Sequence, residues 1–184
     1  MSDNNTSYNG WSNYETWNAS LWIQEGMMDA ETMAHDCLAE SIEDETDMET
    51  AVANATDTLA EQMEDDCNEL CADTCQQSGL FADLLNSALS KINWREIAEN
   101  YVKEIPIYAT GYSMPGYLPD NDPAIFLDHS DALAVLANNI QNLFEDTEQA
   151  EQAEKLAEQI EREAIFEKPL QANFGGYVFW LEKF

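Results

Sequence analysis

The distribution of charge constrains this chain more than any other feature. Its first 90 residues contain 20 acidic side chains and no lysine or arginine, so that Lys91 is the first basic residue. The rest of the chain contains 17 acidic and all seven basic side chains, and the formal net charge of the 184 residues is −30. Carboxylates four residues apart destabilise a helix by roughly 0.2–0.5 kcal/mol per pair. Three explanations stay open: a solvated and highly soluble surface, a host with a high salt content, or an anionic surface that is itself functional.

Composition limits the class of protein. Hydrophobic residues make up 45% of the chain and aromatic residues 10%, which is enough for a packed core. The length suits one domain, or two small domains that share a core. No apolar run approaches the roughly 18 residues that a membrane-spanning helix needs. The polar N-terminus does not resemble a signal peptide, so we expect a cytoplasmic protein.

The sequence also argues against direct nucleic-acid binding and against catalysis. Seven basic side chains are too few to build a phosphate-binding groove in so negative a chain. The same charge disfavours anionic membranes. The two histidines, His35 and His129, lack a recognisable nucleophile pattern, and the chain contains neither a GxGxxG motif nor a P-loop. We therefore expect a protein that is not an enzyme.

Hydrophobic periodicity predicts an acidic helical domain over residues 11–104, preceded by a disordered polar tail over residues 1–10. Two capping boxes support helix starts, Ser12 with Glu15 and Asn93 with Glu96. The expected helices cover residues 13–24, 29–42, 48–77, 80–89 and 94–103. The side chains expected to face inward are Tyr14, Trp17, Leu21 and Trp22 in the first helix, Met33, Cys37 and Ile42 in the second, Met48, Val52, Leu59, Met63 and Leu70 in the third, and Phe81, Leu84, Leu85 and Leu89 in the fourth.

A smaller domain that contains strands is predicted over residues 105–184. Three prolines and a glycine indicate a loop at residues 113–123, and two glycines precede the last strand. The expected elements are strands at 105–112, 124–127 and 177–184 and helices at 131–144 and 147–166. The predicted fold class is α+β, with a mainly helical acidic part followed by a smaller part that has a two- or three-stranded sheet and two helices.

Three sequence motifs resemble known groups of proteins. Residues 10–23, GWSNYETWNASLWI, resemble the opening NYETW…LW motif of small uncharacterised proteins from phages and plasmids. GLFADLL at 79–85 and INWREIA at 92–98 resemble a later block of the same group, so that the resemblance frames residues 10–103. MPGYLPD at 114–120 is similar to a motif in other small acidic phage and plasmid proteins. The resemblance implies no activity, but it implies a mobile genetic element, where genes against host defence are common.

The predicted third helix carries a dense row of carboxylates, and this chain departs from the group in such acidity. Eight carboxylates lie between Asp47 and Glu69, a span of roughly 33 Å and thus one negative charge per roughly 4 Å of axis. One strand of B-DNA carries one charge per roughly 3.4 Å. Such a helix can present a phosphate-like array to a DNA-binding protein, and the alternative is a solvated helix face. The predicted partner-binding residues are Asp36, Glu40, Glu43, Asp44, Glu45, Asp47, Glu49, Asp57, Glu61, Glu64, Asp65, Asp66, Glu69 and Asp73.

The cysteines allow two interpretations. Cys67, Cys71 and Cys75 follow one another at intervals of four residues on the predicted third helix, and Cys37 lies on the second. A structural zinc or iron–sulfur site would use thiolates, but its usual CxxC spacing is absent. We therefore favour small buried hydrophobic side chains and predict no metal, no cofactor and no disulfide.

The aromatic residues are expected to serve mainly as core, although some could form a dimer seam or anchor a partner. We expect exposed contacts from Tyr112, Met114 and Tyr117 in the proline-rich loop.

The preferred hypothesis for function is a phage- or plasmid-encoded DNA mimic. It would inhibit a host DNA- or RNA-binding defence protein, of restriction or CRISPR type, by occupying its basic groove. The first alternative is a structural or regulatory binding module, which could form a homodimer. It would dock through aromatic residues, and its acidity would secure solubility. The second is a protein of a high-salt host, in which acidic surfaces are general.

Overall fold

The computed structural model describes residues 7–44, 47–75, 79–117, 122–163 and 169–184, with the backbone alone at residues 73–75 and 163. The chain divides into two compact units, Met1–Ile105 and Pro106–Phe184. The predicted α+β class is confirmed, because the described residues form five α-helices followed by an antiparallel sheet with two further helices. No helix in the described residues is both long and apolar enough to cross a membrane. Predictions for residues 1–6, for Gln77 and for Phe166 lie outside the described residues.

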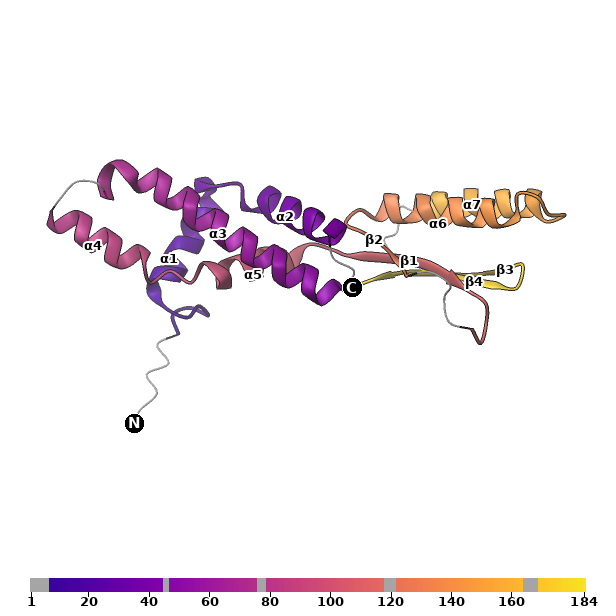
Figure 1. Cartoon of the computed structure of the whole chain (residues 1–184), viewed down its shortest axis with the longest axis horizontal. Coiled ribbons are helices and arrows are strands. Elements are labelled where there is room, and N and C mark those ends of the chain that lie inside the picture. Colours follow the sequence, from indigo (N-terminus) through magenta and orange to yellow (C-terminus); the bar gives the residue numbers. More distant parts are fainter. Residues whose placement is uncertain (1–6, 45–46, 76–78, 118–121, 164–168) are drawn as a thin grey trace, which may run out of the picture. The chain divides into compact units, whose positions relative to one another are not determined.

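The first unit is helical throughout its described length, apart from turns and connections (Figure 1). Its elements are α1 (Tyr14–Trp22), the π-helical segment η1 (Ile23–Met27), α2 (Ala30–Asp44), α3 (Met48–Cys75), α4 (Leu80–Leu89) and α5 (Trp94–Glu104).

Residues 8–11 form a tight turn, so the predicted disordered tail is wrong for this stretch. Tyr8 and Trp11 pair in an antiparallel bridge, in which each backbone N–H donates to the carbonyl oxygen of the other at 2.7 and 3.0 Å. Asn9 and Gly10 have φ angles of 50° and 93°, as a type I′ turn requires, and asparagine and glycine tolerate these angles best. The Tyr8 ring lies 4.8 Å from that of Trp17. The turn therefore holds the Tyr8 ring against Trp17 of α1.

The side of α1 that faces the interior of the first unit carries small side chains. Thr16, Ala19 and Ser20 are buried, whereas Trp22 is 61% exposed. The predicted inward face is therefore wrong for Trp22, Tyr14 and Leu21, which are all exposed, whereas Trp17 is partly buried. Small side chains allow the helix backbone to approach its neighbours closely, and hydrogen bonds to other groups offset the burial of their hydroxyls.

Hydrogen bonds join the starts of α1 and α5. Asn13 is the N-cap of α1 and accepts the Thr16 N–H at 2.7 Å, so the capping box predicted at Ser12 does not form. The Ser12 N–H instead donates to the Glu96 carboxylate at 3.0 Å. Asn93 caps α5 as predicted by accepting the Glu96 N–H at 3.3 Å. The second half of the predicted capping box does not form, because the Asn93 N–H donates to the buried Thr16 Oγ1 at 2.9 Å and not to the Glu96 carboxylate. The NYETW block and the INWREIA block thus stabilise each other's helix starts.

Replacing Thr16 by valine is expected to lower the free energy of unfolding by about 1–3 kcal/mol, because the Asn93 N–H loses its acceptor in a buried place. Thr16→Ser keeps the hydroxyl and is the control for the lost methyl group. Urea unfolding followed by tryptophan fluorescence measures both variants. A valine variant more stable than the serine variant would contradict this role of the hydroxyl.

Helix α3 is the centre of the first unit and packs against α2 and α5 (Figure 1). The Cys37 thiol donates to Gln62 Oε1 at 3.5 Å and the Ser41 hydroxyl to the Ala51 carbonyl at 2.8 Å. Cys37 precedes Ser41 in α2, whereas the partner of Cys37 follows the partner of Ser41 in α3, so the two helices are antiparallel. The buried side chains of α3 follow a row with a spacing of four residues: Ala51, Ala55, Leu59, Met63 and Cys67.

Two predicted inward faces are exposed in part, although Leu59 and Met63 on α3 are buried and Leu85 and Leu89 on α4 are partly buried. Leu70 is 64% exposed, although it shares the predicted apolar stripe of α3 with the fully buried Leu59. On α4, Phe81 is 81% exposed and Leu84 is exposed too, while Ala82 is buried. The main packing partner of α4 within the unit is α3. The apolar stripe of α4 is wider than the surface that α3 offers, so part of the stripe stays exposed.

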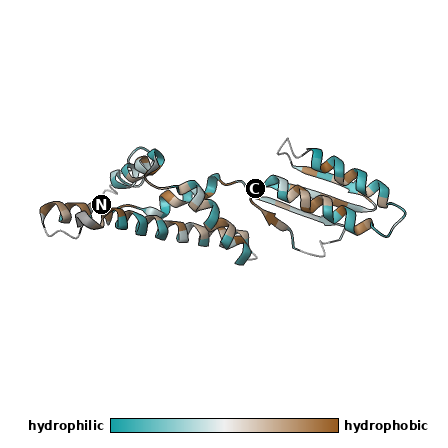
Figure 2. Cartoon of the chain, turned by 90° about the horizontal axis from the view of Figure 1, so that it is seen from above, coloured by the Kyte–Doolittle hydropathy of each residue, from teal (hydrophilic) through white to brown (hydrophobic). Residues whose placement is uncertain are grey.

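The second unit is a four-stranded antiparallel sheet in the order β2-β1-β4-β3, with α6 and α7 on one face (Figure 1). In Figure 2, α7 presents mainly hydrophilic residues to the viewer, on the side away from the sheet. The core between helices and sheet contains Leu136, Ile140, Phe179 and Leu181. The elements are β1 (Tyr108–Ser113), β2 (Ala124–Phe126), α6 (His129–Phe144), α7 (Ala150–Glu163), β3 (Leu170–Phe174) and β4 (Tyr177–Lys183).

Strand β3 is the element that the prediction of two or three strands omits. Its sequence, LQANF, is short and contains polar residues with weak strand propensity. Gly175 and Gly176, with φ of 58° and 88°, form the two-residue turn that pairs Phe174 with Tyr177. The glycine pair is the signal that predicts this hairpin.

Candidate functional site

The carboxylates of α3 form a second row on the side of the helix opposite the buried one. Asp57, Glu61, Asp65 and Glu69 follow one another at intervals of four residues, and each of them is exposed. Four residues rise about 6 Å along a helix, and side chains at this interval share one face. Two further exposed carboxylates flank them. We call the six residues the α3 acidic row: Asp57, Glu61, Glu64, Asp65, Asp66 and Glu69.

The cations of the first unit leave most of this row uncompensated. They lie on α5 or just before it and pair with nearby carboxylates: Lys91 with Glu15 (3.2 Å), Arg95 with Asp57 and Glu99, and Lys103 with Glu99 (3.3 Å). Within the described part of the chain, no ion pair reaches the row between Glu61 and Glu69. Met1–Ile105 contains 23 acidic and three basic side chains, a formal charge of −20. The row is therefore a strongly negative, solvent-facing edge.

The other predicted partner-binding residues belong to α2, to the connection between α2 and α3, and to the two ends of α3. Asp47 accepts from the Thr50 hydroxyl and N–H at 2.6 and 2.9 Å, and these two bonds lower the pKa of the Asp47 carboxyl. Its oxygen thus caps the start of α3. Glu45 lies outside the described residues, as does the side chain of Asp73. The remaining members are exposed: Asp36, Glu40, Glu43, Asp44 and Glu49.

Apolar side chains adjoin the C-terminal end of the α3 acidic row. A hollow of about 390 Å³ lies between η1, α2 and α3, and Asp66 and Glu69 of the row contribute to its lining. Its apolar lining consists of Met27, Met28, Met33 and Leu70. Further along, α4 exposes Leu80, Phe81 and Leu84. Sequence reasoning assigned most of these side chains to the core, so it missed this surface.

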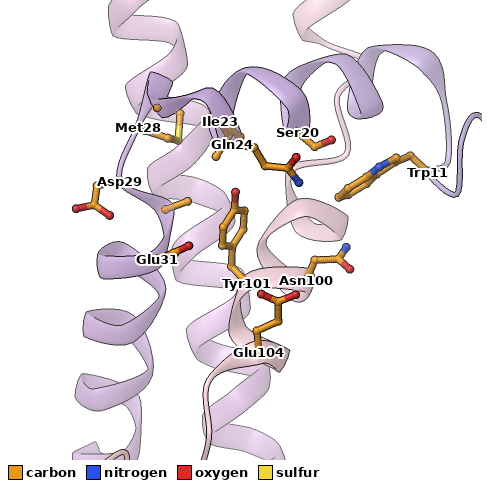
Figure 3. Close-up of a pocket in the computed structure, with 12 residues that line it drawn as sticks. Trp11, Ser20, Ile23, Gln24, Met28, Asp29, Glu31, Asn100, Tyr101 and Glu104 are labelled. Carbon is orange, nitrogen blue, oxygen red and sulfur yellow. The ribbon is translucent and has the colours of Figure 1, made fainter.

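A larger pocket of about 560 Å³ lies on the first unit, where the turn at Trp11, the α1–η1 segment, the start of α2 and the end of α5 meet (Figure 3). Figure 3 shows the Tyr101 hydroxyl pointing toward Ile23 and Gln24, with Trp11 on the opposite side of the opening. Burial, and then the nearby Glu31 and Glu104 carboxylates, raise the pKa of Tyr101. No basic residue is among those that line the pocket. This site is not recognisable in the sequence, because its walls come from four separate segments.

The cysteine side chains that the structure describes are buried at least in part. Cys37 and Cys67 are buried and Cys71 is partly buried. Burial, and then the Glu40 and Asp36 carboxylates, raise the pKa of the Cys37 thiol, which disfavours the thiolate that a metal needs. No group of three or more histidine, cysteine or acidic side chains in the described residues has the arrangement of a metal site. The side chain of Cys75 lies outside the description.

The aromatic residues divide between core and surface. Trp94 is buried, as predicted, whereas Trp22 is exposed. In the proline-rich loop, Met114 and Tyr117 are exposed as predicted. Tyr112 instead packs against the core of the second unit, 5.6 Å from the Phe179 ring, so its predicted role as an exposed contact is wrong.

Residues 4–107 match a protein family whose description is "Family of unknown function (DUF7249)". The match covers more than half of the 184 residues and spans the first unit. The chain belongs to the DUF7249 family. No curated protein and no solved structure matches it. The DUF7249 segment contains both motif blocks of the first unit, the α3 acidic row and the pocket at Tyr101, whereas the sheet of the second unit lies outside the match.

Proposed function

We propose that the DUF7249 segment is a non-enzymatic DNA mimic, encoded by a phage or plasmid. It acts in the cytoplasm of the host cell and occupies the DNA or RNA groove of a defence complex of restriction or CRISPR type. The observation that carries this proposal is the α3 acidic row, which is exposed, regularly spaced and without a cation partner beyond Asp57 among the described residues.

The linear charge density of the row supports mimicry. Six carboxylates between Asp57 and Glu69 rise over about 18 Å of helix axis. One strand of B-DNA carries one phosphate charge per about 3.4 Å, so the two densities are similar. Lysine and arginine side chains that normally hold phosphates would pair with these carboxylates. The helix is held by its buried row against α2 and α5, so the array is presented with little loss of conformational freedom on binding.

The resemblance to phage and plasmid proteins supports the setting of the proposal. A mobile element that enters a cell meets nucleic-acid-binding defence complexes, and a negatively charged competitor for their grooves blocks them without any chemistry. Competition is then reversible and sensitive to salt, because both ligands are attracted by the same cationic surface.

The exposed apolar surface favours a second candidate, a protein-binding module that docks through hydrophobic contacts. Leu80, Phe81 and Leu84 on α4, and Trp22 on α1, are large side chains left in solvent. Contiguous apolar surface, such as the three side chains on α4 present, marks protein–protein interfaces more often than a solitary exposed residue such as Trp22 does. In this alternative the acidity maintains solubility, and binding depends little on salt.

Capture from host lysate at low and high salt separates the two candidates. The immobilised full chain is expected to retain a nucleic-acid-binding protein at low salt, and to release it at high salt and on addition of duplex DNA. Polyglutamate on the same support is the control for non-specific polyanion binding. Retention that withstands both salt and DNA would contradict mimicry and favour the hydrophobic module.

A further inference from the structure

We infer that the pocket between Trp11 and Tyr101 is a binding site for an organic cation, and specifically for an alkylguanidinium group. With a volume of about 560 Å³, it falls in the range typical of small-molecule sites and exceeds what a single metal ion needs. This inference concerns a different surface from the α3 acidic row and is independent of DNA mimicry.

The charge of the lining selects a cation. Asp29, Glu31 and Glu104 line the pocket and no lysine, arginine or histidine does. Glu31 comes from the first turn of α2 and Glu104 from the last turn of α5, so two separate helices direct carboxylates to one place. An anion would meet repulsion here, and a cation would gain attraction from both sides.

The aromatic walls select a flat cation. In Figure 3 the space between Trp11 and Tyr101 is bordered by Gln24 on one side and by Asn100 and Glu104 on the other. A guanidinium is planar, stacks on aromatic faces, and holds five N–H donors in a rigid fork that carboxylate and amide oxygens accept. An ammonium is more strongly hydrated and offers no plane to stack.

The apolar part of the lining accommodates the alkyl stem. Ile23, Met28 and Ala30 line the same pocket, and Ile23 and Ala30 are buried. A stem of several methylene groups would rest on these side chains while the charged end meets Glu104 and Tyr101. The cation can come from a free small molecule or from an arginine side chain of a partner, since both carry this chemistry.

Calorimetric titration of the full chain with agmatine tests the inference. We expect agmatine to bind. N-carbamoylputrescine keeps the terminal ammonium of agmatine but has a neutral urea in place of the guanidinium, so we expect it to bind at least about tenfold more weakly, because the two differ by one charge at that group and hardly in shape. The double variant Glu31→Gln, Glu104→Gln should weaken agmatine binding by about tenfold or more. The matched control Glu61→Gln, Glu64→Gln removes the same charge from α3 and should change binding by less than about twofold.

A capped arginine amide identifies the source of the cation. Tighter binding of agmatine supports a free small cation, and tighter binding of the capped arginine supports a side chain of a partner. Equal binding of agmatine and its urea analogue would overturn the inference, as would equal losses in the pocket variant and in the α3 control. Absence of binding by both cations would overturn it as well. None of these results depends on the outcome of the lysate experiment.

Discussion

Replacing Glu61, Glu64, Asp65 and Asp66 together by lysine is expected to abolish binding to the captured nucleic-acid-binding protein, with a loss of affinity of at least about 10³-fold. Each substitution removes an attraction and places an ammonium group against the cations of the partner. All four side chains are exposed, so the change creates no cavity and buries no charge. A lysine at position 61 would stand four residues after Asp57, an orientation that favours the helix. The variant should therefore fold, which circular dichroism can verify.

A matched control separates the α3 acidic row from overall charge. Lysine at Glu145, Asp146, Glu148 and Glu154 changes the net charge equally, and these exposed residues belong to the second unit. We expect this control to retain most of the affinity at physiological salt, because its substitutions leave every carboxylate of the α3 acidic row in place. Equal losses of affinity in both variants would mean that binding depends on the net charge of the protein and not on the α3 acidic row. Full binding by the α3 variant would refute the row as the contact surface.

Truncation of Leu59 to alanine is expected to destabilise the first unit by about 3–5 kcal/mol. Leu59 is fully buried in α3, which packs against both α2 and α5. The loss combines the transfer free energy of the removed atoms with the cavity left between three helices. Urea unfolding followed by tryptophan fluorescence measures the effect, and four of the five tryptophans belong to the first unit.

Leu70→Ala is the matched control for Leu59→Ala, because it makes the same chemical change on the same helix. Leu70 is largely exposed, so we expect its truncation to change the free energy of unfolding by no more than about 0.5 kcal/mol. Periodicity placed both leucines in one inward stripe, and the structure separates them. Similar losses for the two variants would mean that α3 buries a different face.

The positions of the helices follow from local features of the sequence, and their buried faces do not. The predicted range of α4 is identical to the observed one, since Gly79 precedes it and a strong apolar period runs through it. Yet Phe81 and Leu84 lie in solvent, because no other described element is placed to cover them. In α1 the reverse holds: the aromatic side was expected inside, and Thr16 and Ser20 occupy the interior instead.

The candidate sites show the same division. The carboxylates of α3 are recognisable in the sequence, because a helix converts a spacing of four residues into one face. The pocket at Tyr101 is not recognisable, because Trp11, Glu31 and Glu104 are far apart in the chain and meet through packing. Likewise, the pairing of Arg95 with Asp57 depends on how α5 lies on α3.

The sequence by itself determined the net charge, the absence of cations from the first 90 residues and the helical period of the acidic segment. These properties are sums or local repeats, so they need no knowledge of neighbours in space. Only the tertiary structure decided which carboxylates remain without a cation partner, which apolar side chains stay in solvent, and where a pocket opens. Burial and ion pairing are relations between segments distant in the chain, and these relations arise when the helices pack.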